Sequence, residues 1–201
     1  MSSEASDEVS RAWPTVSASP EALACVPRAR ACIGMGGNLG EVRVRLQSAL
    51  RGLNALPATA VLAVSSAYQT APVDATGPDY LNAVAVLESA LGPQELLAAL
   101  LALELTHDRE RPYHHAPRTL DLDLLWYDDA TRATPSLSLP HPRMTGRAFV
   151  LEPLAEVLAS WPPSGSVTHS SQPALPAADV RAALRQSQGV RRLDGHLWPL
   201  A

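Results

Sequence analysis

The sequence predicts an α/β fold of the α+β type, with a mainly antiparallel β-sheet and two helices on one of its faces. Short apolar segments with the period of a strand alternate with two longer segments whose apolar residues recur at helical spacing. Their order along the chain is β-α-β-β-α-β, which is a split β-α-β arrangement. The chain has 201 residues, of which 46% are hydrophobic, so one domain can bury a sizeable core.

The first half of the chain supplies three strands and a helix. Residues 31–33 form a short apolar strand that runs into the glycine-rich segment 34–40. The helix after it has one apolar stripe, made of Val42, Leu46, Ala49, Leu50 and Leu53. We expect Asn38 or a neighbour to cap this helix. Residues 61–71 and 80–87 are the next two strands, joined by a loop rich in Pro and Gly.

The second half of the chain completes the pattern. Pro93 opens a second helix that ends near Thr106, and a strand over residues 118–127 follows it. Residues 148–158 and 179–186 are predicted to be helical.

Composition divides the chain into three parts. Residues 1–28 are rich in Ser, Ala and Pro without periodicity, so we expect a flexible tail. Residues 29–160 are expected to form the domain, and the divergent segment 161–201 to pack on that same domain.

Charge and hydropathy exclude several classes of protein. The net charge of -4 argues against a nucleic-acid partner, which would require a basic surface. No apolar run reaches transmembrane length, and the N-terminus lacks the apolar core of a signal peptide, so we expect a cytoplasmic protein without a membrane partner. All 16 basic side chains are arginines, which excludes the phosphate-binding lysine of a P-loop.

Two acids interrupt an otherwise apolar strand in the stretch RTLDLDLLWY, residues 118–127. Because side chains alternate along a strand, three leucines share one face, while Asp121 and Asp123 share the other. Leu125 and Tyr127 are expected to continue the face with the acids. The pattern fits either a half-solvated strand end or a site for a divalent metal ion.

Basic residues precede the acid pair on a stretch that two prolines interrupt. Arg109, Arg111 and Arg118 all lie within this stretch. Paired carboxylates bind Mg²⁺ well when substrate phosphates supply the other oxygen ligands, and nearby arginines can hold those phosphates. Separate surface salt bridges are the alternative, each of which contributes little. Three arginines near two acids favour the phosphate site.

Two further motifs have weaker support. Gly34, Gly36 and Gly40 hint at a dinucleotide-binding loop, but their spacing is imperfect and no acid follows to bind the ribose, so a tight turn is favoured. His114 and His115 suggest a zinc site with the acids, although adjacent histidines on a loop rarely converge on one ion.

Aromatic residues make up only 4% of the chain, so each one is a candidate for a specific role in the core or at a binding site. Tyr80 and Phe149 either pack in the core or sandwich a flat aromatic substrate between them. In the second case, Asn82 would read the edge of that substrate through paired hydrogen bonds.

Five blocks between about residues 31 and 153 resemble one known family. They are GGNLG at 36–40, SSAYQTAP at 65–72, PDYLNA at 78–83, PRTLDLD at 117–123 and LPH at 139–141. The block PRTLDLD is the signature of the 6-hydroxymethyl-7,8-dihydropterin pyrophosphokinases (2-amino-4-hydroxy-6-hydroxymethyldihydropteridine diphosphokinases), and the chain resembles this family. The resemblance implies a ferredoxin-like fold. It also implies transfer of pyrophosphate from ATP to the hydroxymethyl oxygen of the pterin, with release of AMP, in folate biosynthesis.

The resemblance implies a role for each matching residue. Asp121 and Asp123 would hold two Mg²⁺ ions that bridge the triphosphate, and Arg109 and Arg118 would stabilise the transition state. The other nucleotide contacts would be Glu104, Arg111, His141 and Arg147. The pterin pocket would consist of Thr70, Ala71, Val73, Tyr80, Asn82, His115 and Phe149, with Tyr80 and Phe149 as the stacking pair. The family usually has Trp-Gly before Pro-Arg-Thr, so here His115 or Tyr113 would have to cover the pterin.

Two other activities share part of this pattern. A non-catalytic pterin- or nucleotide-binding protein would have lost an acid or a transition-state arginine, and neither is lost here. A Mg²⁺-dependent phosphohydrolase would use the same acids but would need no pocket for an organic acceptor. We therefore expect a monomeric enzyme with ATP and the pterin as its small-molecule partners.

Overall fold

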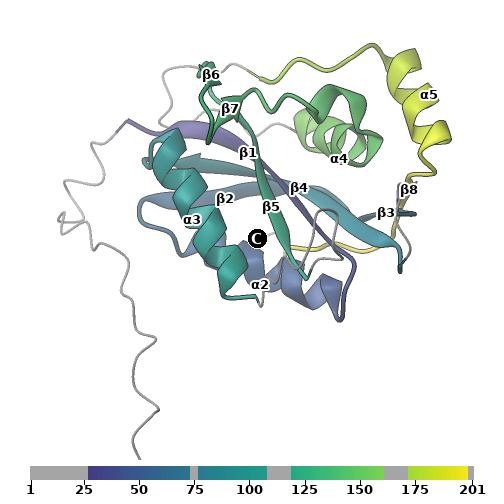
Figure 1. Cartoon of the computed structure of the whole chain (residues 1–201), viewed down its shortest axis with the longest axis horizontal. Helices are drawn as coiled ribbons and strands as arrows, with labels where there is room; N and C mark the ends of the chain where they lie inside the picture. Colours follow the sequence, from purple (N-terminus) through teal and green to yellow (C-terminus); the bar gives the residue numbers. More distant parts are fainter. Residues whose placement is uncertain (1–26, 73–76, 108–118, 161–171, 199–201) are drawn as a thin grey trace, which may run out of the picture.

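The computed structural model describes residues 27–72, 77–107, 119–160 and 172–198, with a six-stranded sheet at the centre (Figure 1). The strands are β1 (Ala29–Gly37), β2 (Thr59–Val64), β3 (Tyr68–Thr70), β4 (Tyr80–Ser89), β5 (Asp121–Tyr127) and β8 (Arg191–Arg192). Their order is β5-β1-β4-β3-β8, and β2 also pairs with β4. Every pair in this sheet is antiparallel, which confirms the predicted fold class.

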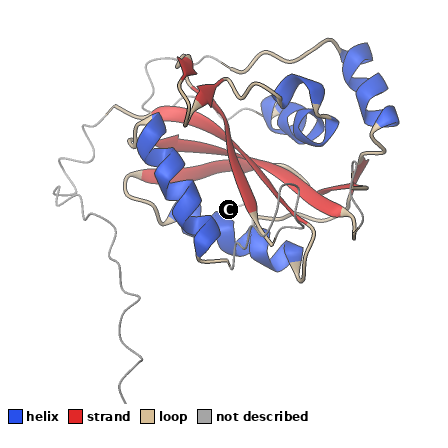
Figure 2. Ribbon diagram, in the orientation of Figure 1, coloured by secondary structure: helices blue, strands red, loops and turns tan. Residues whose placement is uncertain are grey.

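Helices cover both faces of the sheet (Figure 2). On one face, α2 (Val42–Asn54) and α3 (Pro93–Leu105) pack with alternate residues of β1, β4 and β5 into the larger hydrophobic core. On the other face, α4 (Ala148–Ala159) packs on the remaining residues of the same strands in a second core. The helix α5 (Ala178–Ser187) lies against α4 and has no buried residue.

The apolar stripe of α2 is buried as predicted, but its cap differs from the prediction. Glu41 stands at the N-cap and makes no side-chain capping hydrogen bond. Asn38 Nδ2 instead donates to Pro78 O at 3.3 Å, so this side chain connects the start of the helix to the loop before β4.

The N-terminus of α3 is capped as its sequence suggests. The Glu95 carboxylate accepts the Gly92 N–H at 2.7 Å, and Pro93 occupies the first turn, where a missing N–H is tolerated.

The segment predicted as one strand, 61–71, is divided into β2 and β3, which both pair with β4. At the break, residues 65–67, side-chain hydrogen bonds take the place of the regular pairing between strands. Ser65 Oγ accepts the Val84 N–H at 3.0 Å, and Ser66 N donates to a carboxylate oxygen of Glu156 on α4 at 3.1 Å. A contact 90 residues away in the chain leaves no periodic signal, so alternation alone could not predict it.

A β-bulge in β5 corrects the predicted orientation of Tyr127. Cys32 pairs with Trp126 and Ile33 pairs with Leu124, so Leu125 is an extra residue between these pairs. Leu125 stays on the face of the acids as predicted, but the bulge moves Tyr127 to the opposite face, under α3. There its hydroxyl donates to Leu91 O at 2.8 Å. Strict alternation assumes one residue per partner, and the bulge breaks that assumption.

The glycine-rich segment is also more extended than a tight turn. Gly34 and Gly36 lie within β1, and only Gly40, with a φ of 66°, forms the left-handed turn before α2. The tight-turn prediction is therefore wrong for Gly34 and Gly36. The antiparallel sheet does not have the parallel strand order that a dinucleotide-binding unit requires.

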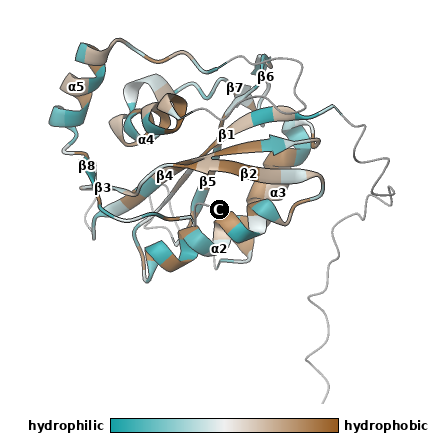
Figure 3. Cartoon of the chain, turned by 180° about the vertical axis from the view of Figure 1, so that it is seen from behind, coloured by the Kyte–Doolittle hydropathy of each residue, from teal (hydrophilic) through white to brown (hydrophobic). Residues whose placement is uncertain are grey.

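The described part of the C-terminal region completes the sheet and carries no long apolar helix. Strand β8 pairs with β3, and Leu193 N donates to Ala67 O at 2.8 Å. Strands β2 and β4 are mostly hydrophobic, in contrast to the mixed surface of α5 (Figure 3). Within the described ranges, no helix is both long and apolar enough to cross a membrane.

Candidate active site

Asp121 and Asp123 begin β5, which is an edge strand of the sheet. Asp121 lies opposite Gly36 and Asp123 opposite Gly34, both on β1. The two carboxylates share the face that α4 covers, and the Asp123 side chain keeps 41% of its surface exposed. Arg147 Nη1, from the residue just before α4, lies 4.0 Å from Asp123 Oδ2. The positive charge of Arg147 therefore faces the predicted phosphate site.

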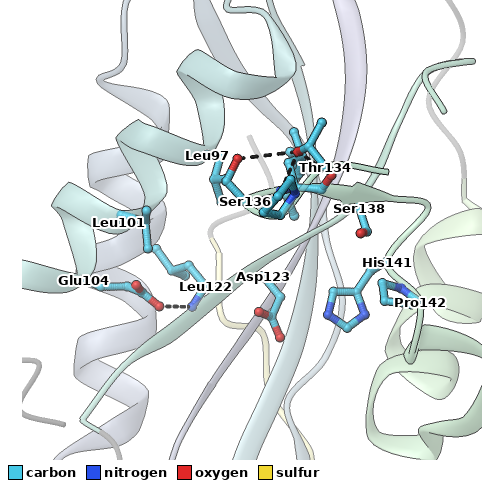
Figure 4. Close-up of a pocket in the computed structure, with 13 residues that line it drawn as sticks. Leu97, Leu101, Glu104, Leu122, Asp123, Thr134, Ser136, Ser138, His141 and Pro142 are labelled. Atoms are coloured by element: carbon cyan, nitrogen blue, oxygen red, sulfur yellow. Dashed lines mark hydrogen bonds between the residues drawn. The ribbon is translucent and has the colours of Figure 1, made fainter. Parts of the chain in front are cut away.

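A groove of about 300 Å³ runs along the outer edge of β5, between α3 and residues 134–142 (Figure 4). Residues 134–142 include β7 (Ser138–Leu139), which pairs with β6 (Arg132–Ala133) in a short hairpin. The chain then forms a short 3-10 helix, η1 (Met144–Gly146), before α4 begins. The apolar lining residues are Leu97, Leu101, Leu122, Leu124, Leu137 and two prolines. The polar lining residues are Glu104, Asp123, Thr134, Ser136, Ser138 and His141. Three residues that the resemblance predicts at the nucleotide, Glu104, Asp123 and His141, therefore line one groove.

Glu104 supports the wall of this groove rather than projecting from it. Its side chain is on the last turn of α3 and is 1% exposed. Glu104 Oε1 accepts the Leu122 N–H at 2.7 Å, which is a backbone donor on the outer edge of β5. This hydrogen bond fixes the edge strand against α3 between the two aspartates.

His141 presents a hydrogen-bond donor to the groove. Burial lowers the pKa of His141 below its usual value; Asp123 acts to raise it, and Arg147 and Arg143 act to lower it further. The imidazole is therefore neutral near neutral pH. The Arg143 N–H donates to His141 Nδ1 at 3.2 Å, so the proton of the neutral ring is on Nε2. Nε2–H can then donate to an oxygen of a bound ligand.

The residues predicted to bind the pterin lie on the same face of the sheet as the aspartates. Asn82 of β4 pairs with Gly36 on one side and with Tyr68 on the other, and Thr70 pairs with Tyr80. Asn82 is 8% exposed, and its Nδ2 donates to Thr70 Oγ1 at 3.1 Å. In the part of the chain that the structure describes, no donor reaches Asn82 Oδ1. The carboxamide thus offers an acceptor to a ligand.

Phe149, in the first turn of α4, lies over this face. Its ring packs against the buried residues Tyr68, Ala148 and Val190, and the Arg147 guanidinium is 5.5 Å from the ring centroid. Phe149 is partly exposed, which leaves part of its surface for a ligand. Ala71 follows β3 directly and is exposed. The predicted residues Val73, Arg109, Arg111, His115 and Arg118 lie outside the described residues, as do Tyr113 and His114.

Known proteins are similar to this chain over about two thirds of its length. Residues 32–159 match the family model described as 7,8-dihydro-6-hydroxymethylpterin-pyrophosphokinase. The chain belongs to this family. The 2-amino-4-hydroxy-6-hydroxymethyldihydropteridine pyrophosphokinase of Synechocystis sp. is 42% identical over 131 residues, which cover 65% of this chain and 67% of that relative. The protein of the same name in Pseudomonas aeruginosa is 43% identical over 129 residues, 64% of this chain and 80% of that relative.

The acid pair of this pyrophosphokinase family member has the donor chemistry that Mg²⁺ requires. Within the described ranges, no group of three or more His, Cys, Asp or Glu side chains is arranged to hold a metal ion. A Mg²⁺ ion needs only one or two carboxylates when substrate phosphates and water complete its oxygen ligands. Asp121 and Asp123 supply two such oxygen donors beside an open groove, so they fit this ion.

Sequence reasoning missed part of this site. The hydroxyl groups of Thr134, Ser136 and Ser138 line the groove, although this segment had no predicted role. Alternating hydroxyl residues between two predicted elements were the one available signal. The sequence predicts a turn at Gly36, whereas the strand register places this residue between Asp121 and Asn82.

Proposed function

We propose that this chain transfers the pyrophosphoryl group of ATP to the hydroxymethyl oxygen of 6-hydroxymethyl-7,8-dihydropterin, as a step of folate biosynthesis. The pterin oxygen forms a new bond to the β-phosphorus. The bond between the β-phosphorus and the oxygen that bridges it to the α-phosphorus breaks, and AMP leaves with that oxygen on its α-phosphate. The hydroxyl proton of the pterin is released. The products are therefore AMP and the pterin diphosphate.

The position of the acid pair between the groove and Asn82 is the observation that carries this proposal. Asp123 lines the groove at the edge of β5, whereas Asp121 lies across Gly36 from Asn82. Neighbouring strands are about 4.8 Å apart, so Asp121 and Asn82 are separated by roughly 10 Å across the sheet. A nucleotide in the groove and an acceptor held at Asn82 would meet at the two aspartates.

The groove has the chemistry of a nucleotide site. Its leucine side chains suit the faces of an adenine ring, and its hydroxyl groups suit the ring edge and the ribose. Toward Asp123, the Nε2–H of His141 and the guanidinium of Arg147 suit phosphate oxygens. The apolar part of the nucleotide would thus lie near α3, and its phosphates near the aspartates.

The sheet face has the chemistry of a pterin site. A pterin presents ring N–H donors and acceptors along one edge, which match the two ends of the Asn82 carboxamide. Thr70 orients that carboxamide through the Nδ2 hydrogen bond. Phe149 offers a partly exposed ring above the same face, which suits stacking on a flat heterocycle.

Asp121 and Asp123 would hold Mg²⁺ together with the triphosphate. When bound, this ion supplies Lewis-acid neutralisation of the phosphate oxygens. Arg147 adds a fixed positive charge beside Asp123, and the Glu104 hydrogen bond to Leu122 keeps the strand that bears both acids in place. These residues hold their charges in place before the reaction begins. Such preorganised charge is the main source of catalysis in the transfer of phosphoryl groups.

Product analysis tests the proposal directly. The protein is incubated with ATP and Mg²⁺, with and without 6-hydroxymethyl-7,8-dihydropterin, and the nucleotides are separated by chromatography. AMP should form only when the pterin is present, in amounts equal to the pterin diphosphate. ADP as the main product, or equal ATP turnover without the pterin, would contradict pyrophosphoryl transfer. Removal of Mg²⁺ with a chelator should stop the reaction.

A further inference from the structure

A glycine of the central strand β1 lies between the two proposed substrate regions. Gly36 pairs with Asn82 of β4 on one side and with Asp121 of β5 on the other. Directly opposed residues in an antiparallel sheet point to the same face. A side chain at position 36 would therefore project between the Asn82 carboxamide and the Asp121 carboxylate. Gly36 itself is buried, so a side chain at this position could not turn outward into solvent.

The Asn82 carboxamide occupies the space that a side chain at Gly36 would need. An ideal Cβ at position 36 would lie 2.8 Å from Asn82 Oδ1 and 3.6 Å from Leu81 O. The first distance is too short for two non-bonded atoms, so one group would have to move. The backbone of both residues is held by the β1–β4 ladder, whereas the carboxamide can rotate. A methyl group at Gly36 would thus turn the Asn82 carboxamide.

Rotation of this carboxamide would change what it presents to a ligand. Its Nδ2 is held by Thr70 Oγ1 at 3.1 Å, and its Oδ1 lies over the backbone of Gly36. A turn away from position 36 strains the Thr70 hydrogen bond and moves the Oδ1 acceptor. Both ends of the carboxamide then lose the orientation that paired hydrogen bonds to a heterocycle require.

We infer that Gly36 is a positioning residue, which sets the orientation of Asn82 and through it the affinity for the pterin. This inference rests on the proposed function, in which the Asn82 carboxamide reads the pterin edge. The lack of a side chain at position 36 lets that carboxamide lie against β1. Asn82, Gly36 and Asp121 are directly opposite one another on three neighbouring strands. The role is distinct from backbone flexibility, because Gly36 is part of a regular strand.

Gly34 offers a matched control on the same strand and the same face. It pairs with Val84 and Asp123, two residues before Gly36. The three atoms nearest to an ideal Cβ at position 34 all belong to the Leu125 side chain, the closest at 3.3 Å. Gly34→Ala adds the same methyl group and the same loss of freedom in the unfolded chain, but it does not touch Asn82.

Binding of 6-hydroxymethyl-7,8-dihydropterin tests the inference in the presence of a non-hydrolysable ATP analogue. Calorimetry is applied to the wild type, Gly36→Ala, Gly34→Ala, Asn82→Ala and the double variant Gly36→Ala/Asn82→Ala. Gly36→Ala should weaken pterin binding by about 10-fold or more, since misaligned buried hydrogen-bonding groups lose affinity on this scale. Gly34→Ala should retain wild-type pterin affinity, and the ATP analogue should bind all variants alike.

The double variant separates positioning from general damage to the sheet. If Gly36 acts through Asn82, the double variant should bind the pterin as weakly as Asn82→Ala alone, because the group that the methyl displaces is gone. Additive losses would overturn the inference. So would wild-type pterin affinity in Gly36→Ala.

A readout without ligand distinguishes this inference from the proposed function. The side-chain amide signals of Asn82 are assigned in ¹⁵N NMR spectra by their loss in Asn82→Ala. In the free protein, Gly36→Ala should shift these signals, and Gly34→Ala should leave them in place. Unshifted signals in Gly36→Ala would overturn the positioning role. If the wild type binds no pterin, the proposed function fails, while the shift still shows that Gly36 positions Asn82.

Discussion

Two carboxylates on the side of the sheet that α4 covers, Glu156 and Asp123, have different surroundings. Near β3, Glu156 of α4 accepts four hydrogen bonds: from Ser66 N at 3.1 Å, Ser66 Oγ at 2.8 Å, Tyr68 OH at 2.8 Å and Arg192 Nη2 at 3.1 Å. At the other edge, the Asp123 side chain is 41% exposed, and the Arg147 guanidinium is 4.0 Å away. The Glu156 side chain is 28% exposed.

The difference separates a structural carboxylate from one that is suited to bind a ligand. Both oxygens of Glu156 accept hydrogen bonds from protein donors, which link α4, β3 and β8. Asp123 borders the groove instead, where a ligand or metal ion can approach it. A carboxylate whose two oxygens accept hydrogen bonds from protein donors stabilises the fold, whereas a ligand can reach a carboxylate on an exposed side chain.

The pKa values reflect the same difference. Burial raises the pKa of Glu156, but the hydrogen bonds from Tyr68 and Ser66 and the charge of Arg192 lower it more, so the result is a pKa below the usual value. The pKa of Tyr68 is raised, first by burial and then by its hydrogen bond to Glu156. Glu156 therefore stays ionised and Tyr68 stays protonated near neutral pH.

The largest expected effect is the loss of turnover on substitution of either aspartate. Asp121→Asn and Asp123→Asn should each lower the rate of AMP formation by a factor on the order of 10³, because metal neutralisation of the triphosphate requires both charges. The pterin affinity without nucleotide should change little. Steady-state kinetics measures the rate and calorimetry measures the pterin affinity, with Glu156→Gln as the control that keeps turnover. A rate within a few-fold of wild type would contradict the metal assignment.

Phe149 connects the two regions, because its ring packs on Tyr68 while Arg147 lies over it. Phe149→Ala should weaken pterin binding by roughly 1–3 kcal/mol, the scale for losing a stacked or buried aromatic partner. Phe149→Leu is the control, since it keeps apolar volume but loses the ring. Calorimetry measures pterin affinity in both variants. Lower stability with unchanged pterin affinity would mean that Phe149 is only a core residue.

Glu156→Gln should lower the free energy of unfolding by about 2 kcal/mol at neutral pH, because it weakens charge-assisted hydrogen bonds to Ser66 and Tyr68. The folded-state pKa of Glu156 is depressed, so its stabilising contribution is present above the unfolded pKa and is lost as pH falls through the folded pKa. The difference between wild type and variant should thus be constant near neutral pH and shrink below about pH 4. Urea unfolding over this pH range measures it; a constant difference would contradict the assignment.

The smallest expected effect is that of Arg192→Ala. The Arg192 side chain is 62% exposed, so its ion pair with Glu156 is screened by water. Loss of an exposed ion pair should lower the free energy of unfolding by about 0.2–1 kcal/mol. Thermal unfolding at low and high salt measures this loss, which should diminish as salt increases. A loss as large as that of Glu156→Gln would mean that Arg192 is the main partner of the carboxylate.

The sequence alone determined the features that depend on local periodicity. The order of the elements, the buried stripe of α2 and the shared face of Asp121 and Asp123 all follow from the period of a helix or a strand. The family resemblance is likewise readable from short contiguous blocks.

Only the tertiary structure decided which distant residues meet. The bulge at Leu125, the placement of Gly36 beside Asn82 and the contact of Glu156 with Ser66 each depend on the pairing of segments far apart in the chain. The groove likewise requires α3, β5 and residues 134–142 to come together. Local periodicity assigns a residue to a face, but strand register and helix packing, which are set by burial of the whole core, decide what lies opposite it.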